Sequence, residues 1–154
     1  MRNFNEADRK KKQARIQKEE NPGNLSQELL ALLDSRVKVS LKDGYLSCPM
    51  AWKIAKEFSV PKIAVGNIAD KLGIRVTDCQ IGCFKVDKTV TSKPMPKDVD
   101  DKVIALLEVI SKNNELTCAK VFELAKQAKL TPMAIADIAN LRKWKVRNCQ
   151  LGCF

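Results

Sequence analysis

Histidine is absent from the 154-residue sequence, and aromatic side chains make up only 5% of it. Without histidine the chain lacks the most common general base and the most common nitrogen ligand for metals, so any metal site must rest mainly on thiolates. The scarcity of aromatic residues leaves an aliphatic core, which favours small helical units over a large β-sandwich. We also find no glycine-rich phosphate loop and no plausible pair of catalytic carboxylates, and therefore expect a protein that is not an enzyme.

Long hydrophobic runs are missing as well. No apolar stretch approaches the roughly 20 residues that span a bilayer. The charged N-terminus is not followed by the apolar segment of a secretory signal, so we expect a cytoplasmic protein. The net charge of +10 suits a nucleic-acid partner, and it equally suits an acidic protein partner.

The most informative feature is an internal repeat at an offset of 70 positions. Leu46 to Phe84 aligns without a gap on Leu116 to Phe154, with 13 identities in 39 positions. The identities include three cysteines in each copy and five of the six residues in CQIGCF and CQLGCF. Two copies that diverged elsewhere have thus kept the same six thiols, which neutral drift alone does not explain.

Apolar periodicity predicts three helices in each copy. In the second copy they cover 101–111, 118–128 and about 132–141, with Thr117 and Thr131 as N-caps and Pro132 at the first helical position. In the first copy they cover 27–35, 48–58 and 63–72. A short strand is expected before the second helix of each copy, and another strand after the third helix, leading into a tight loop.

The predicted domain organisation follows from these elements. Residues 1–24 form a basic charged arm, partly helical or disordered, and residues 85–100 form a polar linker with two prolines. Between and after them lie a first unit, residues 25–84, and a second unit, residues 101–154. The predicted fold class is mainly α with short β strands.

The order helix, strand, helix, turn, helix, strand resembles the winged-helix family. Helix-turn-helix proteins have a small residue early in the first helix of the motif, here the second helix of each unit. They have branched apolar residues in the second helix of the motif, here the third. Ala55, Val60, Val65 and Ile68 stand at the matching places, as do Ala125, Leu130, Ile135 and Ile138 in the second copy. The resemblance covers both units and implies two tandem winged helix-turn-helix units, a fold that serves both DNA binding and protein interaction.

If the resemblance extends to function, the third helix of each unit enters the major groove of double-stranded DNA. The candidate DNA-binding residues lie on and just after that helix: Lys62, Asn67, Lys71, Arg75, Asn140, Arg142, Lys143, Lys145 and Arg147. The outward faces lack arginine and carry an acidic group, so phosphate contacts are more expected than base reading. Aliphatic residues on the same faces, Ile63, Met133 and Leu141, suit a protein partner or a homodimer instead.

The cysteines are the candidate metal ligands: Cys48, Cys79, Cys83, Cys118, Cys149 and Cys153. Along an extended strand the CxxxC cysteines would lie about 13 Å apart, so a shared site needs the segment to curl. Gly82 and Gly152 stand where a positive φ would make such a turn. Cys48 and Cys118 begin the second helices, and we expect each to meet the two cysteines of its own copy.

Four outcomes remain open for these thiols. Each unit could hold an iron–sulfur cluster with a fourth ligand from elsewhere, or zinc with three cysteines and a water, Asp78 or Asn148. The CxxxC pair could instead close to a disulfide as a redox switch. The cysteines could also be small buried core residues.

The sequence therefore predicts a tandem winged-helix protein that binds DNA as a transcriptional regulator and senses metal or redox state through cysteine. The alternative is a non-enzymatic interaction or assembly subunit that docks on a partner protein.

Overall fold

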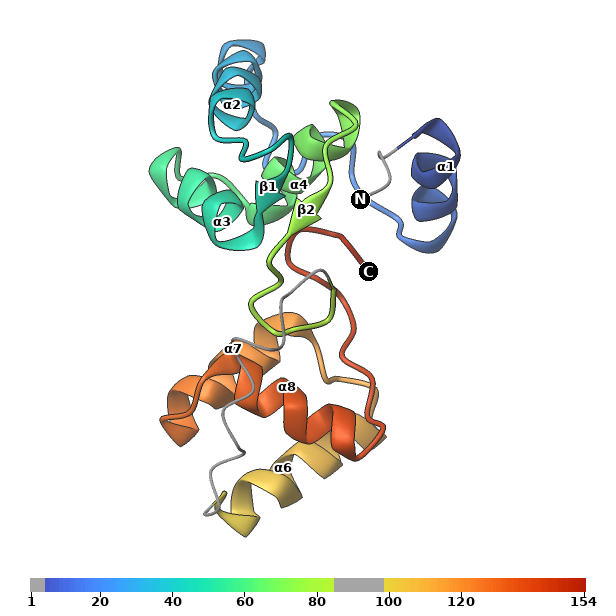
Figure 1. The fold of residues 1–154 in the computed structure, drawn as a ribbon, viewed down its shortest axis with the longest axis vertical. Coiled ribbons are helices and arrows are strands. Elements are labelled where there is room, and N and C mark those ends of the chain that lie inside the picture. Colours follow the sequence, from blue (N-terminus) through green and yellow to red (C-terminus); the bar gives the residue numbers. More distant parts are fainter. Residues whose placement is uncertain (1–4, 85–98) are drawn as a thin grey trace. The chain divides into compact units, whose positions relative to one another are not determined.

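The computed structural model describes residues 5–84 and 99–154, and helices dominate both ranges (Figure 1). One helix precedes the first copy of the repeat, α1 (Glu6–Arg15). The first copy contains α2 (Gln27–Val39), β1 (Leu46–Ser47), α3 (Cys48–Glu57), α4 (Lys62–Lys71) and β2 (Val76–Thr77). The second copy contains α6 (Asp101–Lys112), α7 (Cys118–Ala128) and α8 (Pro132–Leu141). The mainly helical class and the three helices in each copy are confirmed.

The predicted caps of the second copy are also confirmed. The Thr117 hydroxyl accepts a hydrogen bond from the Lys120 amide at 3.2 Å, and the Thr131 hydroxyl accepts one from the Ala134 amide at 3.1 Å. These bonds satisfy backbone donors that the first helical turn leaves without an intrahelical partner. Helix α2 continues four residues past its predicted end at residue 35, because Val37 extends the buried stripe that Leu33 begins.

The strands are shorter than the sequence suggests. Strands β1 and β2 pair in parallel over two residues each, with Leu46 opposite Val76 and Ser47 opposite Thr77. The second copy has a single parallel bridge at the equivalent place, Thr117 to Arg147. Apart from such single bridges, the described residues form no other strand pair, so the strand that leads into each tight loop amounts to two residues or one.

The two copies share backbone detail that their side chains do not dictate. The bonds Val60 N–H to Ala55 O and Leu130 N–H to Ala125 O both measure 2.9 Å, and the bonds Ile74 N–H to Ala69 O and Trp144 N–H to Ala139 O both measure 2.8 Å. Asp78 and Asn148 are both left-handed, with φ of 51°. Equivalent positions thus have the same local conformation even where the residue differs.

Contacts divide the chain into two compact units that do not follow the repeat boundary. Unit 1 comprises residues 1–78 and 150–154, and unit 2 comprises residues 79–149. We name residues 79–84 the first CQxGCF segment and residues 150–154 the C-terminal segment. Each unit therefore contains the segment that belongs in sequence to the other copy, whereas the predicted boundaries, 25–84 and 101–154, keep each segment with its own copy.

The C-terminal segment packs against α4 inside unit 1. Its Leu151 is fully buried, and its Gln150 accepts a hydrogen bond from Lys62 at 2.8 Å. Gly66 of α4 leaves the room for this approach, since a Cβ there would lie 2.8 Å from the Leu151 carbonyl carbon. Six consecutive residues of α4, 64–69, are buried, so this helix is enclosed rather than presented at the surface.

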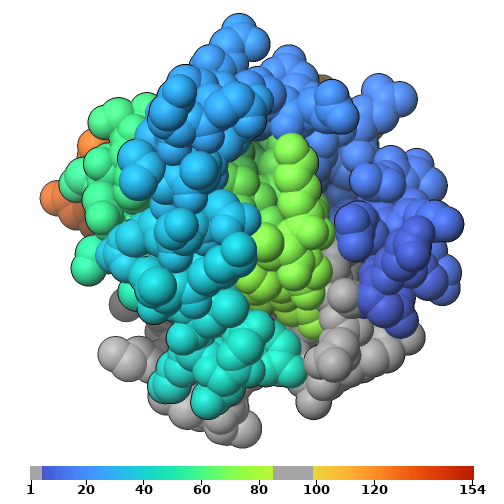
Figure 2. Space-filling model, turned by 90° about the horizontal axis from the view of Figure 1, so that it is seen from above, coloured from blue at the N-terminus to red at the C-terminus, as the bar shows by residue number. Residues whose placement is uncertain are grey.

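The arm covers the other end of α4 through polar contacts. Lys12 and Lys18 each lie 2.7 Å from a carboxylate oxygen of Asp70, and Arg75 lies 2.8 Å from Asp8. No residue of α1 itself is buried, so charge rather than apolar area holds this helix in place. Figure 2 shows the green surface at the end of α4 and β2 lying between the dark-blue arm and the lighter-blue α2. None of the described helices is long and apolar enough to cross a membrane.

Candidate functional site

The two units divide the six cysteines unequally. Unit 1 contains Cys48 and Cys153, and unit 2 contains the other four, Cys79, Cys83, Cys118 and Cys149. This two-and-four division differs from the expected three in each unit, because the first CxxxC pair lies wholly in unit 2, whereas the second pair is divided, with Cys149 in unit 2 and Cys153 in unit 1. No disulfide joins any of the six.

The first CQxGCF segment curls as the sequence predicts. The Gly82 amide donates a hydrogen bond to the Cys79 carbonyl at 2.9 Å, and Gly82 has a φ of 70°. A residue with a side chain rarely adopts this φ, so the glycine allows the turn that brings the two cysteines together. As residues, Cys79 is buried and Cys83 is exposed to solvent.

The turn makes Cys79 an acidic thiol. The Cys83 thiol donates a hydrogen bond to the Cys79 sulfur, and the amides of Ile81, Cys83 and Phe84 add three more donors. Burial raises the pKa of Cys79, but these hydrogen bonds have the larger effect and lower it to about 6. The pair therefore carries one negative charge at neutral pH, shared through the hydrogen bond between the sulfurs.

The pKa of Cys83 shifts in the opposite direction, upward. Its hydrogen bond to Cys79 raises the pKa of Cys83, and partial desolvation of its sulfur and the charge on Cys79 raise it further. The charges of Cys118 and Cys149 also raise it, so Cys83 responds to the other three cysteines of unit 2. One thiolate beside one retained proton is the arrangement that thiol–disulfide exchange uses, with the thiolate attacking and the second thiol resolving.

This geometry predicts a titration near pH 6. Thiolate absorption in the ultraviolet, taken as the difference between the native protein and Cys79→Ser, should have its midpoint at about pH 6. In Cys83→Ala the midpoint should move upward by about one pH unit or more, because the largest stabilising bond is gone. Cys153→Ala, at the equivalent position of the other segment, is the matched control and should leave the midpoint in place. An unchanged midpoint in Cys83→Ala would show that the two thiols do not interact.

The arrangement of the cysteines suits a reactive thiol pair better than it suits a metal site. No three of the cysteine, aspartate and glutamate side chains in the described ranges are arranged to hold a metal ion. Unit 1 has only two cysteines, too few for the three-thiolate site that the sequence predicts in each unit. Unit 2 has enough sulfurs for such a site, but they would have to move to share an iron–sulfur cluster or a zinc ion. The geometry of the first CQxGCF segment thus favours thiol chemistry.

In unit 1, three of the four predicted DNA-binding residues make contacts within the protein. Lys62 donates to Gln150 and lies 3.8 Å from the centre of the Trp52 ring. Asn67 is 9% exposed and its amide donates to the Glu19 carbonyl. Arg75 pairs with Asp8, and only Lys71 is exposed.

In unit 2 the corresponding residues face solvent. Five of them are exposed: Asn140, Arg142, Lys143, Lys145 and Arg147. Arg142 lies 5.8 Å from the centre of the Trp144 ring, and Arg147 donates to the side chain of Asn114 at 3.2 Å. The exposed residues that follow α8 form one basic segment, 142–147, next to the exposed Leu141.

The role of the arm is not predicted by the sequence. Its Asp8 pairs with Arg75, and its Lys12 and Lys18 pair with Asp70 of α4. The high charge of the arm is visible in the sequence, but no pattern links it to an aspartate more than 50 positions away.

No protein-family model, no curated protein and no solved structure matches the chain.

Proposed function

We propose that the chain is a DNA-binding regulator of the tandem winged-helix type that responds to the redox state of thiols. The observation that supports this proposal best is the hydrogen-bonded Cys79–Cys83 pair, with the pKa of Cys79 lowered to about 6. Thiols of ordinary acidity stay protonated at neutral pH, whereas in this pair the buried Cys79 is already ionised and the exposed Cys83 keeps its proton.

The proposed response is a two-electron oxidation of the pair. Disulfide exchange with a small oxidised thiol would begin with attack by the Cys79 thiolate and expulsion of one thiolate. Attack by Cys83 on the mixed disulfide would expel the second, with the Cys83 proton passing to a leaving thiolate. The pair lies directly after β2, at the point where the chain leaves unit 1 and enters unit 2. A new covalent bond there would change the path of the connecting segment.

The proposed DNA contact is the basic segment 142–147, because its cationic side chains are exposed, whereas Lys62 and Arg75 of unit 1 are engaged within the protein. Lysine and arginine without base-reading neighbours contact phosphates, which gives affinity that falls steeply with salt. We therefore expect binding to duplex DNA with little sequence preference.

A gel-shift titration on random duplex tests both parts. Replacing Arg142 and Lys143 together with glutamine should reduce the slope of log K against log salt by about 2, one for each lost phosphate contact. Lys53→Gln with Lys56→Gln, two exposed cations on α3, is the charge-matched control and should leave the slope near its native value. Oxidised and reduced protein should differ in affinity, and the difference should vanish in Cys79→Ser with Cys83→Ser.

Each outcome decides one part of the proposal. Absence of binding at low salt removes the DNA-binding part. Equal affinities of oxidised and reduced protein remove the thiol part and leave the DNA-binding part standing.

An interaction or assembly subunit is the second candidate, favoured by exposed aliphatic residues of unit 2. Leu141 is 68% exposed, and Leu106 and Val109 of α6 are 44% and 57% exposed. Side chains of this kind at the surface suit docking on another protein. Co-purification of one stoichiometric protein without nucleic acid would favour this candidate over DNA binding.

A further inference from the structure

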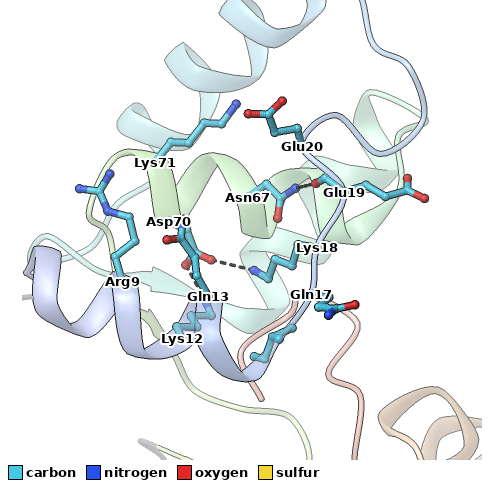
Figure 3. Close-up of a pocket in the computed structure, with 11 residues that line it drawn as sticks. Arg9, Lys12, Gln13, Gln17, Lys18, Glu19, Glu20, Asn67, Asp70 and Lys71 are labelled. Atoms are coloured by element: carbon cyan, nitrogen blue, oxygen red, sulfur yellow. Dashed lines mark hydrogen bonds and ion pairs between the residues drawn. The ribbon is translucent and has the colours of Figure 1, made fainter.

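A cavity of about 350 Å³ lies between the arm and α4 inside unit 1 (Figure 3). Its walls include Arg9, Lys12 and Lys18 from the arm and Asn67, Asp70 and Lys71 from α4. Small-molecule sites in proteins span roughly 300–1,000 Å³, so this space could admit one small ligand.

One wall of the cavity carries a buried acceptor that the protein does not use. Asn67 is 9% exposed, and its amide nitrogen donates to the Glu19 carbonyl at 2.7 Å. The amide oxygen, Oδ1, is also buried and has no hydrogen-bond partner among the described residues. Because a buried acceptor without a partner costs about 1–3 kcal/mol, a ligand that donates to it would recover that loss.

A second wall carries an unused donor. Arg9 Nε is buried and likewise has no hydrogen-bond partner in the described part of the chain. The guanidinium is always charged, so the group that pairs best with it is an anion. A ligand for this cavity thus needs an anionic acceptor for one wall and a hydrogen-bond donor for the other.

The charge of the cavity agrees with an anionic ligand. Lys12 and Lys18 share the single carboxylate of Asp70, each at 2.7 Å. Burial lowers the pKa of Lys18, Asp70 counteracts this, and Lys12 adds to the lowering. Arg9 and Lys71 bring two further positive charges to the lining, and Glu19 and Glu20 bring two negative ones, so the lining as a whole keeps one net positive charge.

The same charges restrict the donor. Asn67 shares this lining with Lys12 and Lys18, so an ammonium group directed at Oδ1 would be repelled. A neutral N–H donor carries no such penalty, and the exocyclic amine of a nucleobase is one. A phosphate and a neutral amine within one small molecule describe a nucleotide, and they do not describe an amino acid.

We propose that the cavity between the arm and α4 binds a mononucleotide whose base carries an exocyclic amine. Its phosphate lies beside Arg9 and Lys71, and its amine donates to Asn67 Oδ1. Such a ligand contacts both α1 and α4 and fastens the arm over the helix. This site is independent of the thiol pair and of the DNA contact proposed above.

Calorimetric titration of the full chain with adenosine monophosphate tests the site. Inosine monophosphate, in which a carbonyl replaces the amine, should bind about tenfold more weakly, because Oδ1 then faces an acceptor. Arg9→Gln should weaken the binding of adenosine monophosphate by a similar factor. Because Arg9 Nε has no hydrogen-bond partner among the described residues, this variant breaks no hydrogen bond of that atom. Arg15→Gln, an exposed cation on the same helix that does not line the cavity, is the matched control.

Saturable binding of adenosine monophosphate that falls with inosine monophosphate and with Arg9→Gln, but not with Arg15→Gln, supports the site. Three results would overturn it: no saturable binding, equal affinity for inorganic phosphate alone, or equal affinity in Arg9→Gln and the native chain.

Discussion

Gly66→Ala is expected to destabilise unit 1 by about 3 kcal/mol, at the upper end of what overpacking of a core usually costs. The new Cβ would overlap the Leu151 carbonyl oxygen and lie 3.1 Å from the Leu151 Cα. Backbone atoms surround it, so no side-chain rotation relieves the clash, and the C-terminal segment must leave its place on α4. Leu151, which is fully buried there, would lose its apolar contacts as well.

The sign of the effect makes this a decisive test. Intrinsic helix propensity favours alanine over glycine by about 1 kcal/mol, so a helix without the C-terminal segment would be stabilised by the substitution. Ala136→Gly, the reverse change at the equivalent buried position of α8, measures the propensity effect together with the loss of one buried methyl group. The chain has two tryptophans, Trp52 in unit 1 and Trp144 in unit 2. Urea unfolding followed by Trp52 fluorescence in a Trp144→Phe background therefore reports on unit 1, and a more stable Gly66→Ala would contradict the packing described here.

Asp70→Asn is expected to release the arm. The substitution keeps the size of the side chain but removes the carboxylate that lies 2.7 Å from both Lys12 and Lys18. Removing one partner of a buried ion pair costs about 3–5 kcal/mol. The three side chains here are 14–17% exposed, so we expect roughly 2–3 kcal/mol. The two lysines would then repel each other, which adds to the loosening.

Limited trypsin digestion measures this release, because α1 contains several lysines and arginines. When opening is fast relative to cleavage, the cleavage rate follows the population of the open arm, so it should rise roughly 30- to 150-fold. Asp34→Asn breaks an exposed pair with Lys38 within α2 and serves as the control, with an expected cost of about 0.5 kcal/mol or less. If Asp70→Asn is cleaved at the native rate, the ion pairs do not hold the arm.

The helices were predictable because their causes are local. Thr131 before Pro132 marks the start of α8 through capping and a fixed φ, and the buried positions of α7 recur at helical spacing. The turn at Gly82 was predictable for the same reason, since a CxxxC pair that meets needs a residue with positive φ. The end of α2 was missed because Val37 lies among polar residues and its burial depends on distant parts of the chain.

The exchange of the two segments could not be predicted from the sequence. The motifs CQIGCF and CQLGCF differ only in the position of one methyl group, Ile81 against Leu151, so composition does not show which α-helix each one contacts. The choice depends on the path of the chain between the units and on the space above Gly66, both of which are properties of the assembled fold. The six candidate thiols were found from sequence, but their division between the units was not.

Unit 1 is built from two separate stretches of the chain, and this affects the order in which the protein can fold during synthesis. Helix α4 leaves the ribosome early, but the segment that covers Gly66 begins at residue 150, after all of unit 2 has been made. At about 5–20 residues per second, that delay lasts on the order of several seconds. During this interval the groove over α4 is open to any apolar segment that fits, and the first CQxGCF segment, nearly identical in sequence, emerges first. We therefore expect nascent unit 1 to pass through a stage in which its own copy of the motif competes for the place that the later copy finally takes.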